Sequence, residues 1–234
     1  MLFRSELRHA AFSADGIPFG GVTGVNEKGI AVAVHQNFSK DAGSNAGPML
    51  FIGELILRQA NTLEDAVEIL RQNRPGQLWT FILSDLRRGQ VLAIEASTRH
   101  FEIRGMEGEF FAQSNHLLGS ASRAEEYISE SVLLNSQYRF EYALGQAQTA
   151  RVRGSVSAGR AAAILAAQKH SSGDLAGYED LIKANTIQSV VLGAKAGQEP
   201  KVYMSSDRAP TASGRYVGFK LSALWQREIG RAHV

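Results

Sequence analysis

An Asn-His pair, Asn115-His116, follows a short run of β-prone and polar residues, Phe110 to Ser114. An asparagine at a strand end can direct its side-chain N–H groups at a developing oxyanion, and such a preorganised donor lowers the barrier by about 3–4 kcal/mol. The alternative is an asparagine that ends the strand with a turn in which the side chain binds nearby backbone. Spacing alone favours the turn, so the catalytic interpretation of Asn115 needs independent support.

Other residues capable of chemistry favour structural roles. The six histidines are not spaced as metal ligands, so we expect no metal site. His35 falls in a β-prone run and is interpreted as a strand residue rather than a general base. Glu95 interrupts an apolar strand and is predicted on its exposed face, because a buried carboxylate would need a partner such as an arginine. Asp85 is expected to be a turn residue, and no G-x-S-x-G nucleophile motif is present.

Composition excludes further classes of protein. The 234 residues are 44% hydrophobic and 21% charged, as is usual for a globular chain, and they include no cysteine. Disulfides, Cys-ligated metals and a thiol nucleophile are therefore excluded within this sequence. The net charge of +2 gives no electrostatic footprint for nucleic acid. No apolar stretch approaches the roughly 20 residues of a membrane span, and the first residues carry no signal-peptide pattern, so a cytoplasmic location is the default expectation.

Hairpins alternate with blocks of helices along the chain. Two hairpins are predicted, from strands 20–25 and 30–34 and from strands 78–84 and 91–96, with further strands over 100–104, 110–113, 187–192, 202–204 and 216–221. One helix is predicted over 48–60, and a second begins at a capping box formed by Thr62 and Asp65. Further helices are predicted over 122–131, 137–147 and 158–169. This order predicts a single α+β domain with antiparallel sheet rather than alternating βαβ units.

Five short motifs occur in the order found in one enzyme family. The segment Gly24 to Val32 resembles the G-x-N-E-x-G-[IL] hairpin of the acyl-coenzyme A:6-aminopenicillanic acid acyltransferase family. Ser114-Asn115-His116 resembles its [TS]-N-H strand end. The other three matching segments are Leu63 to Ala66, Phe81 to Asp85 together with Ala93 to Ala96, and Asn185 to Val190. The resemblance extends from about residue 20 to residue 221.

The resemblance implies an N-terminal-nucleophile (Ntn) hydrolase. In this family, a four-layer αββα sandwich holds a cysteine that is freed by self-cleavage and attacks a linear amide bond, with its own α-amine as the base. Neither a cofactor nor a metal is implied, and the substrate is a small-molecule amide or acyl compound. Carried over residue by residue, Asn115 holds the oxyanion and His116 supports it. Arg139 resembles a recurrent family arginine whose role is left open.

The family nucleophile lies upstream of the N-E-x-G hairpin, where this chain has only about twenty residues and no cysteine. We therefore expect residues 1–228 to be a partial domain that lacks the N-terminal part of the fold and is inactive by itself. The codons able to encode Ile229 to Val234 match a widely used sequencing adapter, so residues 229–234 are interpreted as read-through. Two alternatives remain: a catalytically inactive binding or scaffold homologue, and an amidase of the bile-salt-hydrolase or acid-ceramidase type. The oligomeric state is left open.

Overall fold

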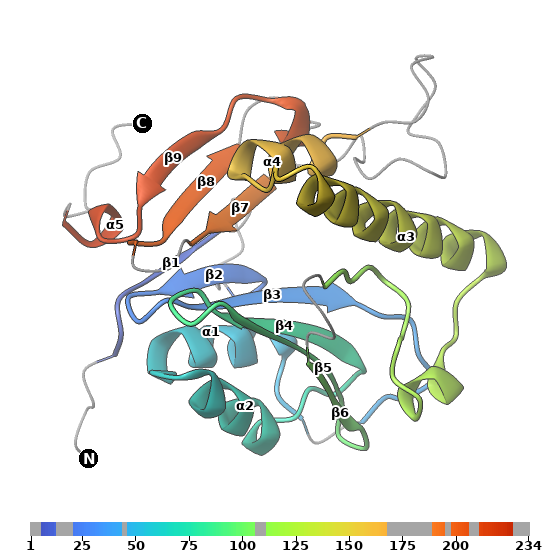
Figure 1. The fold of residues 1–234 in the computed structure, drawn as a ribbon. Helices are drawn as coiled ribbons and strands as arrows, with labels where there is room; N and C mark the ends of the chain where they lie inside the picture. Colours follow the sequence, from blue (N-terminus) through green and yellow to red (C-terminus); the bar gives the residue numbers. More distant parts are fainter. Residues whose placement is uncertain are drawn as a thin grey trace.

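The computed structural model describes residues 6–12, 21–43, 46–105, 111–167, 189–194, 198–205 and 211–226 (Figure 1). In these ranges the chain forms two antiparallel sheets with helices on their outer sides. The predicted α+β class is therefore confirmed. Residues 229–234, for which read-through was predicted, lie outside the described ranges.

Six strands form the first sheet in the order in which they follow along the chain, and each pairs antiparallel with the next. They are β1 (His9–Ala11), β2 (Thr23–Asn26), β3 (Ile30–Gln36), β4 (Trp79–Asp85), β5 (Gln90–Ala96) and β6 (Phe101–Gly105). The two predicted hairpins are confirmed as β2–β3 and β4–β5. Strand β1 was not predicted, because three residues are too few to show an alternating pattern.

The turn between β2 and β3 explains the N-E-x-G motif. The Asn26 side-chain oxygen accepts hydrogen bonds from the backbone N–H groups of Lys28 and Ile30, each at 3.0 Å. Its amide nitrogen donates to the carbonyl oxygens of Leu57 and Ala60, at 3.2 and 2.8 Å. Gly29 completes the turn at a φ of +89°, a region that glycine enters without steric cost. The motif therefore has a structural role, since it ties the hairpin to the end of a helix.

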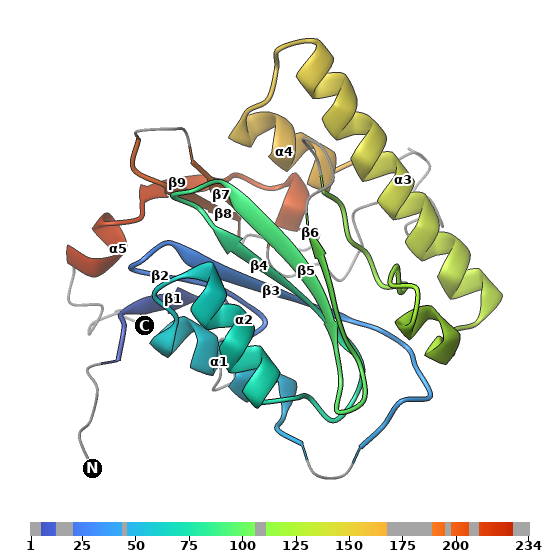
Figure 2. The same ribbon diagram turned by 60° about the horizontal axis from the view of Figure 1, so that its bottom comes forward.

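That helix, α1 (Met49–Gln59), and the next, α2 (Leu63–Gln72), lie side by side on one face of the first sheet (Figure 2). The predicted capping box is confirmed, because the Asp65 backbone N–H donates to the Thr62 hydroxyl at 3.1 Å and the Asp65 carboxylate accepts from the Thr62 backbone N–H at 3.2 Å. A continuous apolar core lies between helices and sheet. Its fully buried large side chains include Ile30, Ile56, Leu57, Leu70, Phe81, Leu83 and Ile94.

The second sheet covers the opposite face of the first. It consists of β7 (Ser189–Gly193), β8 (Lys201–Ser205) and β9 (Val217–Lys220) in antiparallel order. Val25 and Ala31 of the first sheet share a core cluster with Val202 and Leu221 of the second part of the chain. Helix α4 (Ala158–Leu165) packs against β7, and a short helix α5 (Ala223–Gln226) follows β9. The layers thus run helix, sheet, sheet, helix, as in the predicted sandwich (Figure 1).

Two predictions for the middle of the chain are wrong. The segments 122–131 and 137–147 were expected to be separate helices, but Ser122–Glu125 is a 3₁₀ turn and α3 runs unbroken over Glu130–Val152. Asn135 and Ser136 lower helix propensity by only a few tenths of a kcal/mol each, and Ser136 gains tertiary hydrogen bonds that offset this. Residues 111–113, expected in a strand, are irregular, and the Gln113 side chain accepts a hydrogen bond from Arg104 of β6.

None of the helices within the described ranges combines the length and apolar character that a membrane span requires.

Candidate active site at the end of strand β3

The structure brings together the three residues singled out in the sequence. Asn115 lies on the loop before α3, and its side-chain oxygen accepts a hydrogen bond from the Arg139 guanidinium at 2.8 Å. Its amide nitrogen donates to the Gln36 carbonyl oxygen at the end of β3, at 2.9 Å. Arg139 also donates to the Asn135 side chain at 3.0 Å. Both ends of the Asn115 amide are thus fixed, and one of its two N–H bonds is left to point at a ligand.

His116 contacts the serine that binds the Asn115 backbone. Its Nδ1 lies 3.1 Å from the Ser114 hydroxyl and 2.9 Å from the Ser136 hydroxyl, and its ring packs edge-on against Phe140. The same Ser136 hydroxyl accepts the Asn115 backbone N–H at 2.8 Å. Burial, reinforced by nearby arginines, lowers the pKa of His116 to about 4, so the imidazole is neutral near pH 7. The supporting role of His116 in catalysis stays a prediction.

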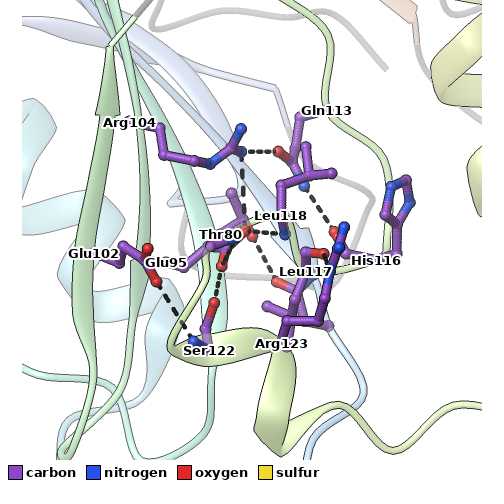
Figure 3. Close-up of polar contacts among 12 residues, drawn as sticks. Thr80, Glu95, Glu102, Arg104, Gln113, His116, Leu117, Leu118, Ser122 and Arg123 are labelled. Carbon is purple, nitrogen blue, oxygen red and sulfur yellow. Dashed lines mark hydrogen bonds and ion pairs between the residues drawn. The ribbon is translucent and has the colours of Figure 1, made fainter.

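Three side chains from β5 and β6, those of Glu95, Glu102 and Arg104, fix the loop (Figure 3). Glu95 accepts the backbone N–H groups of Leu118 and Gly119, at 2.8 and 3.0 Å, and the Ser122 hydroxyl. The Arg104 guanidinium lies 3.8 Å from Glu95 and donates to the Gln113 side chain at 2.6 Å. The loop that carries Asn115 is therefore attached to the sheet through charged hydrogen bonds, which are about twice as strong as neutral ones.

Glu102 completes this attachment. Its carboxylate accepts the backbone N–H groups of Ser120, Ala121 and Ser122. Burial raises the pKa of Glu102, but these hydrogen bonds outweigh it and hold the pKa below its ordinary value. A Cβ at Gly119 would clash with the Glu102 carboxylate, so a larger residue there would displace that side chain from the loop.

The prediction for Glu95 is therefore wrong, because the side chain is fully buried rather than exposed. It has the arginine partner that a buried carboxylate was said to need. The predictions for the other two residues are confirmed. His35 is a residue of β3, and the Asp85 side chain accepts the backbone N–H groups of Arg87 and Arg88 in the turn after β4.

Sequence reasoning missed Asn37, which follows β3 directly. Its side chain is 8% exposed, and its oxygen accepts the Thr80 hydroxyl at 2.7 Å. Its amide nitrogen has no hydrogen-bond partner among the described residues. A buried polar atom without a partner is rare in folded proteins, and at a candidate site it marks a donor available to a ligand. The only sequence signal was a polar residue at a strand end, which equally fits a loop.

Arg139 gives the site a positive charge. No ion pair with a carboxylate is found for it in the described part of the chain. Burial lowers its pKa from a value so high that the group remains charged near neutrality. No group of three or more His, Asp or Glu side chains in the described ranges is arranged to hold a metal ion. The geometry thus offers amide donors and one cation, which suit a carbonyl oxygen that becomes negative.

Comparison with known proteins gives one family and one fold. The family model described as acyl-coenzyme A:6-aminopenicillanic acid acyl-transferase matches residues 1–153. A variant of conjugated bile acid hydrolase from Clostridium perfringens is 13% identical with a TM-score of 0.58, and the match covers 91% of this chain and 76% of that one. A second mutant of that hydrolase is 14% identical with a TM-score of 0.56, and the match again covers 91% of this chain and 76% of that one.

Penicillin V acylase from Agrobacterium tumefaciens is 15% identical with a TM-score of 0.52, covering 86% of this chain and 66% of that one. At such identities the structures show a shared fold alone. No curated protein sequence matches the chain significantly.

Proposed function

Since the chain belongs to the acyl-coenzyme A:6-aminopenicillanic acid acyltransferase family, whose members are amide-bond hydrolases and acyltransferases of Ntn type, we propose that the site at the end of β3 binds the carbonyl group of a linear amide. The observation that carries this proposal is the fixed orientation of the Asn115 amide between Arg139 and the Gln36 carbonyl. The free N–H of Asn115 then donates to the carbonyl oxygen. Hydrolysis is the preferred outcome, with transfer to an amine or thiol acceptor as its variant.

The catalytic contribution of Asn115 is electrostatic. When a nucleophile attacks the carbonyl carbon, the oxygen becomes negative, and a donor already aimed at it needs no reorganisation. The unpaired amide of Asn37 is available as a second donor at the same strand end. Arg139 acts through Asn115, because its hydrogen bond fixes which end of the amide faces the ligand. His116 and Ser136 act in the same way on the backbone of Asn115.

We propose that the nucleophile comes from a segment that precedes this sequence, since the chain contains no cysteine. We assign it to an N-terminal cysteine freed by self-cleavage upstream of residue 1, with residues 1–228 as the remainder of the domain. Its thiolate attacks the amide carbon, and the tetrahedral intermediate collapses to a thioester as the amine leaves with a proton from the α-ammonium group. Water or an acceptor amine then cleaves the thioester and restores the thiol.

The missing cysteine also favours a second candidate, a binding or scaffold homologue on the same fold that performs no chemistry. The two candidates differ in what precedes residue 1. Within the first candidate, the similar solved structures suggest conjugated bile acids and penicillin V as probes, because those compounds appear in the names of the neighbours. A cytoplasmic location remains a prediction.

The test joins the chain to the upstream segment encoded at its own locus. We expect self-cleavage that exposes a cysteine, followed by release of amine from penicillin V or a conjugated bile acid. Asn115→Ala should lower kcat by about 10²–10³-fold with a smaller effect on KM. Asn61→Ala, which alters an exposed asparagine far from the site, is the matched control. Full activity of Asn115→Ala would refute the oxyanion role, and an upstream segment without a nucleophile would favour the scaffold homologue.

A further inference from the structure

A row of polar side chains crosses the inner face of the first sheet. The strand registers pair His35 of β3 with Thr80 of β4, Thr80 with Glu95 of β5, and Glu95 with Glu102 of β6. Directly paired residues share a face, so all four belong to the face that carries Ala31, which packs toward the second sheet. This polar row lies at the end of the sheet where Asn115 binds β3.

Three members of the polar row are engaged by the protein itself. Thr80 donates to Asn37, and Glu95 and Glu102 accept the loop N–H groups described above. His35 differs from them. Its side chain is partly exposed, and neither ring nitrogen has a hydrogen-bond partner in the described part of the structure. An imidazole at a candidate site that has no hydrogen-bond partner among the described residues is suited to contact a ligand.

The charge state of His35 is also defined. Burial, together with the nearby Arg139 guanidinium, lowers the pKa of His35 to about 4. Near pH 7 the ring is therefore neutral and offers one N–H donor and one acceptor nitrogen. The amide donors around it, those of Asn115 and Asn37, can only give hydrogen bonds to a ligand. Of these three side chains, His35 is therefore the one that can supply an acceptor to a ligand.

We propose that His35 contacts the substrate by accepting the N–H of the scissile amide, while Asn115 donates to the carbonyl oxygen of the same group. The inference rests on the proposed function and deepens it by naming the residue that contacts the N–H of the amide. His35 is one residue from Gln36, whose carbonyl holds Asn115, so the imidazole and the Asn115 amide belong to the same strand end. An ester or an N-methylated amide lacks the N–H and leaves the acceptor nitrogen of His35 without a partner, which weakens binding by roughly tenfold.

Binding to the chain as it exists tests this directly, since a protein without the nucleophile cannot consume the probes. The probes are N-hexanoylglycine, its ester analogue O-hexanoylglycolate and its N-methyl analogue N-hexanoylsarcosine. Dissociation constants and the ¹⁵N resonances of the histidine rings are measured on the wild-type chain, on His35→Phe and on His35→Gln. We expect the wild type to prefer the secondary amide by about tenfold, with a shift at His35 and none at buried His116.

His35→Phe should reduce this preference to about one, whereas His35→Gln should retain it, because the glutamine oxygen is also an acceptor. An unchanged preference in His35→Phe would overturn the inference, as would an unperturbed His35 resonance with all three probes. If His35→Phe does not fold, the His35 resonance of the wild type and the amide preference of His35→Gln still test whether His35 contacts the amide. If the full-length enzyme cleaves amides with dependence on Asn115 but not on His35, only this inference fails. Amide cleavage that is indifferent to Asn115 refutes the proposed function instead.

Discussion

Replacing Ser136 with alanine tests whether α3 positions Asn115. The substitution removes only a hydroxyl that is fully buried and that accepts the Asn115 backbone N–H at 2.8 Å. His116 and Ser114 keep their mutual contact at 3.1 Å, and Ser114 keeps the Ser136 carbonyl at 2.8 Å, so the loss falls on the Asn115 N–H. A buried donor left without an acceptor costs about 1–3 kcal/mol. Ser136→Ala should therefore destabilise the chain by about that amount.

Two measurements check the expectation. Urea denaturation gives the change in the free energy of unfolding, and hydrogen exchange gives the protection of the Asn115 amide, which should fall roughly tenfold for each 1.4 kcal/mol of local destabilisation. Ser131→Ala removes an exposed hydroxyl from the first turn of the same helix and should change neither value measurably. If Ser136→Ala keeps both the stability and the Asn115 protection of the wild type, the positioning role assigned to Ser136 is refuted.

Three further predictions concern stability. Asn26→Ala should lower the free energy of unfolding by about 2–4 kcal/mol, because four backbone groups lose their partner. The control Asn61→Ala should change it by no more than about 0.5 kcal/mol. Equal effects of the two substitutions in urea denaturation would contradict the structural role of Asn26 in the turn. Since His116 has a pKa of about 4 folded against 6.5 unfolded, its contribution is complete above pH 6.5 and is lost as the pH falls toward 4, by at most about 3 kcal/mol. His116→Gln should flatten that part of the pH–stability curve, and an unchanged slope would show that His116 is not responsible. Thr62→Ala should cost about 1 kcal/mol through loss of the capping box, measured by the thermal unfolding midpoint, and a wild-type midpoint would argue against the cap.

Local patterns explain which parts of the fold could be predicted. The β2–β3 and β4–β5 hairpins, the helix after Pro48 and the Thr62 cap each depend on residues close together in sequence. The unbroken α3 could not be predicted, because Ser136 inside it is compensated by contacts with Ser114 and Asn115, which lie about twenty residues earlier.

The face of the sheet on which Glu95 lies shows a second limit of prediction from sequence. Alternation correctly separates Glu95 from its apolar neighbour Ile94, but it does not say which face is covered. The cover over Glu95 is a loop more than twenty residues downstream, which brings the N–H groups of Leu118 and Gly119 to the carboxylate. The same holds for the site. Asn115 was singled out from its place at a strand end and Arg139 through a family resemblance, whereas Asn37 and His35 become candidates only when their surroundings can be seen in three dimensions.

The polar row across β3 to β6 also affects the register in which the strands of the first sheet pair during folding. A slip of any one strand by a single residue exchanges its two faces. For β5 such a slip would move Glu95 into the apolar layer beneath α1 and α2 and bring Ile94 under the loop that carries Asn115. A carboxylate without hydrogen-bond donors in that layer costs several kcal/mol, comparable to the whole stability of a small domain. The hydrogen bonds between Glu95 and the loop therefore also favour the correct register of β5 against its neighbours. Once Glu95 is buried under the loop, the strands are in register, and the strand end to which a ligand would bind is in place.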